Sequence, residues 1–339
     1  MIDPLQRWRG YGEKPDFAGP LSFGGAPLTQ DARDLEGADV AIVGAPTDDA
    51  VSDRSGTRFA PRAIRAASCP PGPHLEAGID AFEELRIVDY CDAPVLPADH
   101  VRTQRAIAET VSEVVAAGAI PIVLGGDHSI TSPDVRACAL THGPVGLVHF
   151  DTHTDTGTEV FGVGESHGTP MYQLVEAGLV APERYVQIGL RGYWPGDDVF
   201  AWQAERGITS FFMHDVRERG IDAVVAETIE RVGTRPAFLT VDIDVLDPAF
   251  APGTGTPEPG GMTLLELLPA CRQVAAGLDL VGADVVEVIP TMIGSADITA
   301  LAAERIVREI LTGIAMRRRA GGGDATGRFR RSGTSPAAS

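Results

Sequence analysis

The segment HFDTHTDTG, residues 149–157, has a histidine or an aspartate at alternate positions: His149, Asp151, His153 and Asp155. It directly follows an apolar run that is typical of a buried strand. Side chains of an extended chain point alternately to its two sides, so residues two apart project together. The segment is therefore expected to present several metal-binding or acid–base groups on one side.

Two other segments place the same residue types directly after apolar runs. Asp127 and His128 end the segment IVLGGDHS, and Asp242 and Asp244 end the segment FLTVDID. In a parallel sheet, the carboxyl ends of the strands meet at one edge, where ligands bind. An isolated aspartate after a strand is usually a turn former or a helix cap. Three strand ends with the same chemistry instead favour a metal centre, because adjacent carboxylates need a counter-charge.

Six residues are the candidate metal ligands: His128, Asp151, His153, Asp155, Asp242 and Asp244. Two imidazoles and four carboxylates are too many ligands for one tetrahedral zinc ion. They fit two ions that share bridging carboxylates, and the oxygen-rich set favours Mn²⁺, with Ni²⁺ and Co²⁺ as alternatives. His149 lies deeper on the same side, so we expect it to be buried or to support a ligand.

Eight apolar runs rich in valine and isoleucine predict strands at 39–46, 85–90, 119–126, 145–151, 185–191, 208–213, 236–244 and 280–290. Amphipathic segments predict helices at 101–117, 217–231, 263–276 and 298–317. Most strands lack regular alternation, as expected where helices cover both faces of a sheet. The pattern predicts an α/β fold, a three-layer α/β/α sandwich around an eight-stranded, mostly parallel sheet.

The domain organisation predicted from this pattern is simple. Residues 1–36 form an irregular N-terminal segment, and residues 37–318 form a single catalytic domain. Residues 319–339 have the glycine, serine, alanine and proline content of a disordered C-terminal tail.

The formal net charge of −19 disfavours nucleic acid and anionic membranes as partners and favours cationic small molecules. The four cysteines form no paired spacing, which indicates free thiols in a reducing compartment. The sequence shows no secretory signal and no run of about 18 apolar residues, the length of a membrane span. These features predict a cytoplasmic protein that acts on a small molecule.

Three motifs resemble the signatures of the ureohydrolase superfamily, which includes arginase and agmatinase. They are GGDHS at 125–129, DTHTDTG at 151–157 and TVDIDVLDPAFAPGTGTPEPGG at 240–261. Residues 44–68 are similar to the N-terminal segment of the agmatinase branch, and the resemblance covers roughly residues 38–317. It implies an amidinohydrolase that cleaves a C–N bond of a linear guanidino compound, releasing an amine and urea. It also implies a homo-oligomer, commonly a trimer or hexamer.

The resemblance implies a division of the ligands between two Mn²⁺ ions. One ion would be bound by His128, Asp151, Asp155 and Asp242. The other would be bound by Asp151, His153, Asp242 and Asp244. Asp151 and Asp242 would therefore bridge.

The resemblance also implies the roles of residues around the metals. His167 resembles the histidine that delivers a proton to the departing amine, and Glu287 the carboxylate that binds the guanidinium group. Thr256 resembles a residue that lines the same pocket. His167, Glu287 and the ligand Asp155 are the expected catalytic residues, and Glu287, Thr256 and His167 are expected to contact substrate.

The substrate and two other hypotheses stay open. Agmatinases commonly have a Tyr-Asp pair where this chain has Met292 and Ile293, and Trp194 is a candidate for narrowing the cavity. The sequence favours an agmatine-type substrate, with guanidinobutanoate, guanidinopropionate and free guanidine as alternatives. A deacetylase of related fold would need a single zinc ion. A degenerate family member would be a structural or regulatory subunit without activity.

Overall fold

A sheet of eight parallel strands forms the centre of the computed structural model, which describes residues 1–321 except 13, 16–17, 70–71 and 292–296. In chain order the strands are β1 (Val40–Ala45), β2 (Ile87–Asp92), β3 (Ile120–Gly125), β4 (Val145–Phe150), β5 (Val180–Leu190), β6 (Thr209–Phe212), β7 (Ala237–Asp242) and β8 (Leu280–Val286). Their order across the sheet is β2-β1-β3-β8-β7-β4-β5-β6, with every named pairing parallel. The predicted eight-stranded α/β fold is confirmed.

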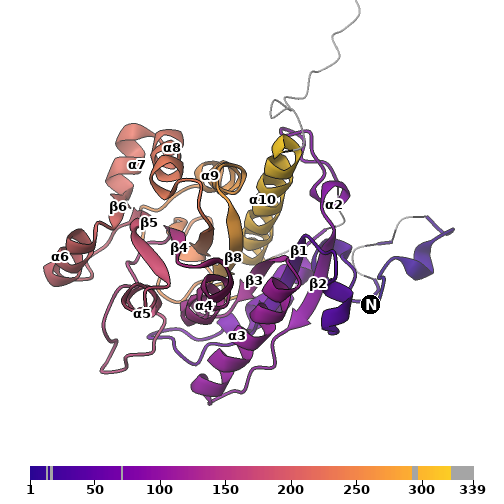
Figure 1. Ribbon diagram of the computed structural model, residues 1–339, viewed down its shortest axis with the longest axis horizontal. Helices are drawn as coiled ribbons and strands as arrows, with labels where there is room; N and C mark the ends of the chain where they lie inside the picture. Colours follow the sequence, from indigo (N-terminus) through magenta and orange to yellow (C-terminus); the bar gives the residue numbers. More distant parts are fainter. Residues whose placement is uncertain (13, 16–17, 70–71, 292–296, 322–339) are drawn as a thin grey trace, which may run out of the picture.

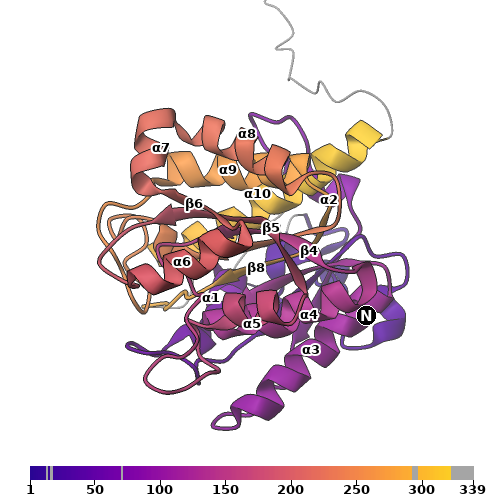
Figure 2. The same cartoon turned by 60° about the vertical axis from the view of Figure 1, so that its left-hand side comes forward.

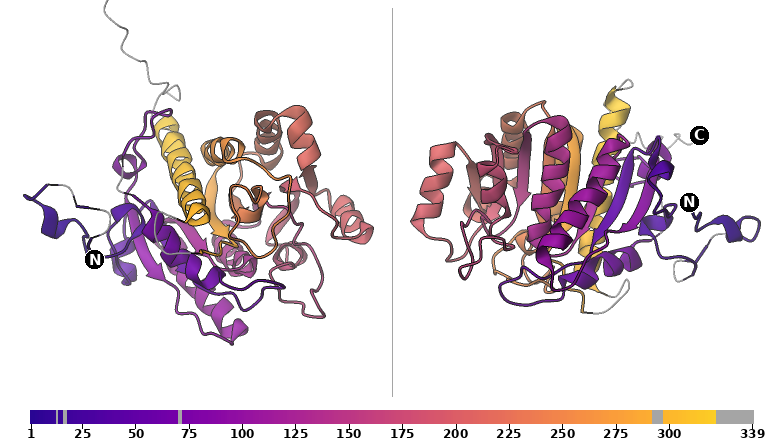
Figure 3. Two further views of the ribbon diagram at one scale, coloured as in Figure 1. Left: turned by 180° about the vertical axis from the view of Figure 1, so that it is seen from behind. Right: turned by 60° about the horizontal axis from the view of Figure 1, so that its bottom comes forward.

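Helices cover both faces of the sheet (Figures 1 and 2). The helices are α1 (Ala60–Ala67), α2 (Ala81–Glu84), α3 (His100–Ala116), α4 (Thr131–His142), α5 (Pro170–Glu176), α6 (Asp197–Arg206), α7 (Met213–Arg219), α8 (Ile221–Val232), α9 (Leu264–Gly277) and α10 (Ile298–Gly321). Helices α3, α4 and α5 pack on one face, and α7 to α10 pack on the other. This is the predicted three-layer sandwich (Figure 3).

Both faces of each central strand are buried, which explains the continuous apolar runs in the sequence. In β1, Val40 and Ile42 join the core beneath α10, whereas Ala41 and Val43 join the core beneath α3. Successive residues of one strand therefore contribute to two different cores.

Two predicted boundaries needed correction. The predicted helix at 217–231 is divided at Gly220, whose φ of +80° ends α7 before α8 begins. The predicted tail start at 319 is too early, because α10 continues to Gly321. Arg318 pairs there with Asp39, and Arg319 pairs with Glu84. Residues 322–339 lie outside the described residues.

The N-terminal segment, residues 1–36, precedes the first strand of the sheet. Its described residues contain three short 3-10 helices, η1 (Gln6–Trp8), η2 (Phe23–Gly25) and η3 (Ala32–Leu35). Phe23 and Leu35 are fully buried, so the segment packs on the domain. Among the described residues, no helix combines the length and apolar character needed to cross a bilayer.

Candidate metal centre and active site

The candidate site lies at the carboxyl ends of four strands that are neighbours in the middle of the sheet. The order of these strands is β3, β8, β7, β4. His128 begins the 3-10 helix η5 (His128–Ile130) after β3, and Asp244 lies in the 3-10 helix η6 (Ile243–Val245) after β7. Glu287 directly follows β8. Residues far apart in sequence therefore meet at one edge, as the parallel arrangement requires.

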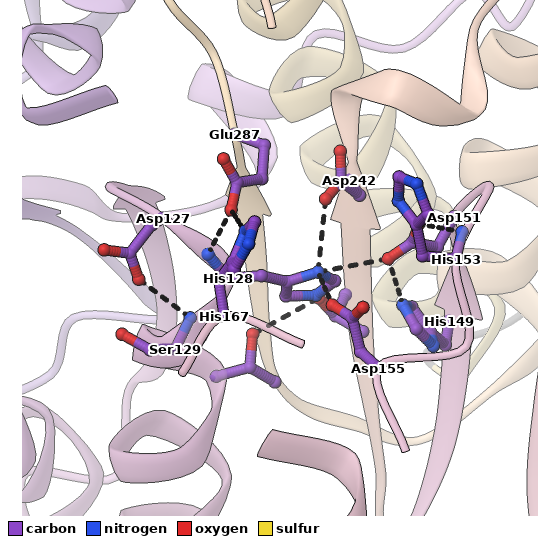
Figure 4. Close-up of polar contacts among 12 residues, drawn as sticks. Asp127, His128, Ser129, His149, Asp151, His153, Asp155, His167, Asp242 and Glu287 are labelled. Carbon is purple, nitrogen blue, oxygen red and sulfur yellow. Dashed lines mark hydrogen bonds and ion pairs between the residues drawn. The ribbon is translucent and has the colours of Figure 1, made fainter. Parts of the chain in front are cut away.

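Three carboxylates surround one imidazole nitrogen (Figure 4). His128 Nδ1 lies 2.9 Å from Asp155 Oδ2, 3.1 Å from Asp151 Oδ2 and 3.2 Å from Asp242 Oδ2. Ligand atoms at adjacent corners of an octahedral ion are about 3 Å apart when the metal–ligand bonds are about 2.1 Å. We call these four residues the first ligand group. Their spacing fits a divalent cation.

The hydrogen bond of the His128 ring is made by Nε2, which leaves Nδ1 available for a cation. Its Nε2 lies 2.9 Å from Thr240 Oγ1, while the buried Nδ1 has no hydrogen-bond partner in the described part of the chain. Burial lowers the pKa of His128, but Asp151, Asp155 and Asp242 outweigh burial and raise it well above its ordinary value. The three carboxylates thus attract positive charge at Nδ1, which a metal ion can supply.

A second ligand group shares Asp151 with the first. His153 Nδ1 lies 3.1 Å from Asp244 Oδ2 and 3.5 Å from Asp151 Oδ1. Asp151 therefore offers Oδ2 to the first group and Oδ1 to the second, the arrangement of a bridging carboxylate. Burial raises the pKa of Asp151, but the imidazoles of His149, His128 and His153 outweigh it and lower the pKa well below its ordinary value.

The two carboxylate oxygens of Asp242 have different partners. Its Oδ2 faces His128 in the first group, but its Oδ1 accepts a hydrogen bond from the backbone N–H of Asp244 at 2.8 Å. This bond caps the short helix η6. Asp151 Oδ1 likewise accepts a hydrogen bond from the backbone N–H of His153 at 2.5 Å, and because a carboxylate oxygen has two lone pairs, such a bond leaves either residue able to bind a cation.

The ligands converge through loop and 3-10 geometry rather than through strand alternation. Strand β4 ends at Phe150, and Asp151, His153 and Asp155 lie in the following loop. Asp155 has a φ of +46°, in the left-handed region. The expectation that these side chains project together was right, but the extended geometry assumed for it was wrong.

Glu287 and His167 form a pair beside the first ligand group. Glu287 Oε1 accepts a hydrogen bond from the backbone N–H of His128 at 2.9 Å and lies 2.9 Å from His167 Nδ1. The other oxygen, Oε2, is buried and has no hydrogen-bond partner among the described residues. One carboxylate oxygen of Glu287 is thus bound to the backbone of His128 and faces His167, and the other has no partner in the part of the chain that the structure describes.

His167 is held by Ser52 in a way that suits either protonation state. Its Nε2 lies 2.7 Å from Ser52 Oγ, which can accept a hydrogen bond from a protonated Nε2 or donate one to an unprotonated Nε2, and 3.0 Å from the Ser52 backbone nitrogen, whose N–H can donate to an unprotonated Nε2. Burial lowers the pKa of His167, but Glu287, Asp155 and Asp127 outweigh burial and raise it to about 9. In both states Nδ1–H faces Glu287, so the exchangeable proton is at Nε2.

A cavity of about 390 Å³ opens over these groups. Its inner wall includes the ligands His153, Asp155 and Asp242. Its lining also includes Ser52, His167 and Thr256. This size suits a small organic substrate.

The mouth of the cavity is formed by Glu159, Val160, Phe161 and Trp194. Val160 and Val163 exchange two backbone hydrogen bonds of 2.9 Å around a tight turn, which places Phe161 87% exposed at its tip. Trp194 lines this cavity. Met292 and Ile293, which were compared with the agmatinase Tyr-Asp pair, lie outside the described residues.

Sequence reasoning did not identify Ser52 or Glu159 as site residues. The signal for Ser52 was present, because it lies in the segment at 44–68 that resembles the agmatinase branch. Glu159 follows the ligand loop by four residues, but its position at the mouth depends on the turn at Val160–Val163.

Comparisons with known proteins agree with this geometry. The model of the Arginase family matches residues 38–313. The chain is 43% identical to a guanidinopropionase of Pseudomonas aeruginosa over 88% of this chain and 93% of that protein. It is 40% identical to an agmatinase of Chromobacterium violaceum over 87% and 88%, respectively.

A solved structure, that of proclavaminate amidino hydrolase from Streptomyces clavuligerus, superposes with a TM-score of 0.83 at 36% identity. The match covers 90% of this chain and 100% of that one. The predicted superfamily is confirmed, and the deacetylase hypothesis is not supported. Because the family model matches residues 38–313 and a relative of 43% identity covers 88% of the chain, the chain belongs to the arginase family.

Proposed function

We propose that this protein is a binuclear, metal-dependent amidinohydrolase of the agmatinase type, which hydrolyses a linear guanidino compound to an amine and urea. The main support is the sharing of Asp151 between two ligand groups beside a cavity that also contains His167. When bound, two Mn²⁺ ions would supply a hydroxide nucleophile near neutral pH. Ni²⁺ and Co²⁺ are alternatives for the same ligands.

The proposed ligands are the members of the two groups. The first ion would be held by His128, Asp151, Asp155 and Asp242. The second would be held by Asp151, His153 and Asp244, with Asp242 as a further ligand. The distances of 2.9–3.5 Å between ligand atoms support this division.

Glu287 would bind and orient the guanidinium group of the substrate. A planar guanidinium pairs with a carboxylate through charge-assisted hydrogen bonds. The unpartnered Glu287 Oε2 is available for such a bond, while Oε1 is fixed by the His128 backbone. A fixed carboxylate would hold the central carbon in one orientation toward the metal centre, which lowers the entropic part of the barrier.

His167 would deliver the proton that the leaving amine needs. The ring lines the cavity, and the Ser52 hydroxyl can accept a hydrogen bond from Nε2–H or donate one to the unprotonated Nε2. A general acid must lose and regain a proton in each turnover. The Ser52 contacts support that exchange without movement of the ring.

The charges at the cavity mouth favour a substrate with a cationic or neutral tail. Glu159 lines the mouth, and no arginine or lysine lines this cavity among the described residues. A carboxylate tail, as in a guanidino acid, would meet a like charge there and would lack a basic partner. Val160, Phe161 and Trp194 offer apolar surface to the methylene groups of the tail. Agmatine combines both features.

Urea release tests the proposal. Agmatine, 4-guanidinobutanoate, 3-guanidinopropionate, arginine and guanidine would be compared with Mn²⁺ and with Ni²⁺ loaded protein. We expect the highest kcat/KM for agmatine. Glu159→Gln should reduce the preference for agmatine over 4-guanidinobutanoate by roughly threefold to fivefold, since an exposed charge pair is worth under about 1 kcal/mol.

Glu165→Gln is a matched control, because Glu165 is also exposed but lines a different cavity. Faster turnover of a guanidino acid than of agmatine would reassign the substrate. Release of no urea from any compound by metal-loaded protein would instead support the non-enzymatic subunit.

Replacing His167 by alanine should lower kcat for urea release by roughly 10²- to 10⁴-fold, the usual contribution of a general acid. Metal content should stay normal, because His167 belongs to neither ligand group. Added imidazole should restore part of the rate by occupying the vacated space. His214→Ala, on exposed surface of α7, is the control. An unchanged kcat would reject the proton-transfer role.

The cellular and quaternary setting is proposed from the sequence. All four cysteines are free thiols, which supports a reducing compartment such as the cytoplasm. A homo-oligomer, a trimer or hexamer, follows from the resemblance to the family.

A further inference from the structure

His149 is a fully buried histidine next to the proposed metal centre whose role the ligand groups do not explain. Its Nε2 lies 2.7 Å from Asp151 Oδ2, and its ring meets that of His128 edge-on at 5.0 Å. Its ligand atom also lies within 4.8 Å of those of His128, Asp151 and Asp155. His149 is therefore placed either to bind a metal ion itself or to hold Asp151.

The hydrogen bonds on the far side of the ring decide between these roles. Gln187 Nε2 lies 2.7 Å from the backbone oxygen of Thr154, which can only accept, so this atom is the amide nitrogen and donates. The same nitrogen lies 2.8 Å from Tyr185 Oη and donates its second hydrogen there. Ser210 Oγ lies 3.0 Å from Gln187 Oε1, which agrees with this orientation of the amide.

The Tyr185 hydroxyl then has one available acceptor for the hydrogen bond that it donates. The hydroxyl already accepts from Gln187, and His149 Nδ1 lies 3.0 Å away as the remaining partner in the described structure. Burial raises the pKa of Tyr185 well above its ordinary value, so the hydroxyl keeps its proton. The Tyr185 O–H therefore donates a hydrogen bond to His149 Nδ1. The lone pair of the neutral imidazole is then on Nδ1, and its proton is on Nε2.

We infer that His149 is a positioning residue and not a metal ligand: Tyr185 and Gln187 lock it as the tautomer with its proton on Nε2, which donates to the bridging Asp151. A nitrogen that carries a proton has no lone pair for a metal ion. The inference rests on the proposed metal centre, but its evidence is which groups donate and which accept in this buried hydrogen-bond network. Such a donor fixes the orientation of a ligating carboxylate.

The same network holds the rest of the ligand loop. Gln187 fixes the backbone of Thr154, and Gln203 Nε2 donates to Thr156 Oγ1 at 2.8 Å. Ser210 Oγ lies between the two glutamines, 3.0 Å from Gln187 Oε1 and 3.1 Å from Gln203 Oε1, so its one proton can be donated to either oxygen. Thr154 and Thr156 flank Asp155, whose left-handed backbone needs support from its surroundings. Strands β5 and β6 and helix α6 thus position two ligands, Asp151 and Asp155.

Tyr185→Phe tests the inference by removing one hydroxyl and keeping the ring. We expect it to weaken Mn²⁺ binding by roughly tenfold or more, the usual cost of losing such a supporting contact. Nitrogen-15 NMR of Zn²⁺-loaded protein should show His149 with its proton on Nε2 in the parent and a changed tautomer population in the variant. Tyr172→Phe is the control, because the Tyr172 hydroxyl makes no hydrogen bond to described residues.

His149→Asn provides a second test that does not depend on activity. We expect it to bind two Mn²⁺ ions at saturating manganese, with weaker affinity, whereas His128→Asn should lose an ion. A His149→Asn protein that binds one ion at saturation would make His149 a ligand and overturn the inference. So would a Tyr185→Phe protein with parental Mn²⁺ affinity and an unchanged His149 tautomer. Loss of urea release alone would bear on the proposed function and not on this inference.

Discussion

Asp151→Asn should remove most of the bound metal and lower kcat for urea release by on the order of a hundredfold or more. The reason is that Asp151 offers Oδ2 to the first ligand group and Oδ1 to the second. Asparagine keeps the shape but replaces one oxygen by an amide nitrogen, which does not ligate such ions well. The same change removes a negative charge that offsets the charge of both ions. Metal analysis of purified protein and a urea assay measure the two effects.

Asp134→Asn is a matched control for the loss of a buried carboxylate. Asp134 is fully buried on α4, and neither of its oxygens has a hydrogen-bond partner in the described structure. Burial and the nearby Asp284 raise the pKa of Asp134 well above its ordinary value. Its replacement should leave metal content and turnover unchanged. If Asp151→Asn kept two ions with normal turnover, Asp151 would not bridge.

The sequence was informative about the site because parallel strands impose a simple geometry. Each central strand is buried on both faces, so each is visible as an apolar run with a clear end. Polar residues after such ends must meet at one edge of the sheet. This reasoning brought His128, Asp151 and Asp242 together without knowledge of the strand order, and their contacts at 3.1–3.2 Å agree with it.

Sequence was less informative where the chain leaves regular structure. The left-handed backbone of Asp155 and the turn at Val160–Val163 depend on contacts from other elements, among them Gln187 and Gln203. Glutamine in a strand or helix carries no pattern that identifies it as a loop support. Ser52 reaches His167 across 115 residues of chain, and that contact depends on the packing of two loops. Such residues become visible only when the fold is known.

Asp242 and Glu287 each have one carboxylate oxygen that accepts a hydrogen bond from the backbone. The donors are the backbone N–H groups of Asp244 and of His128, and the other oxygen of each residue takes no part in that bond. An acidic residue that caps a helix and a residue that binds a ligand are usually treated as alternatives in a sequence. One side chain can do both where its two oxygens face different partners, as they do in Asp242.

Glu287→Gln should lower kcat/KM for urea release by roughly 10²- to 10⁴-fold, since removing one partner of a buried charge pair costs about 3–5 kcal/mol. The amide oxygen can still accept from the His128 backbone, so metal content should remain near normal. Glu287 is among the groups that raise the pKa of His167 to about 9, so its loss should lower that pKa, and NMR titration should show His167 losing its proton at lower pH. Glu165→Gln is the control. A Glu287→Gln protein with parental kcat/KM would show that another residue binds the guanidinium group, and one that lost its metal would show that Glu287 supports the ligands and not the substrate.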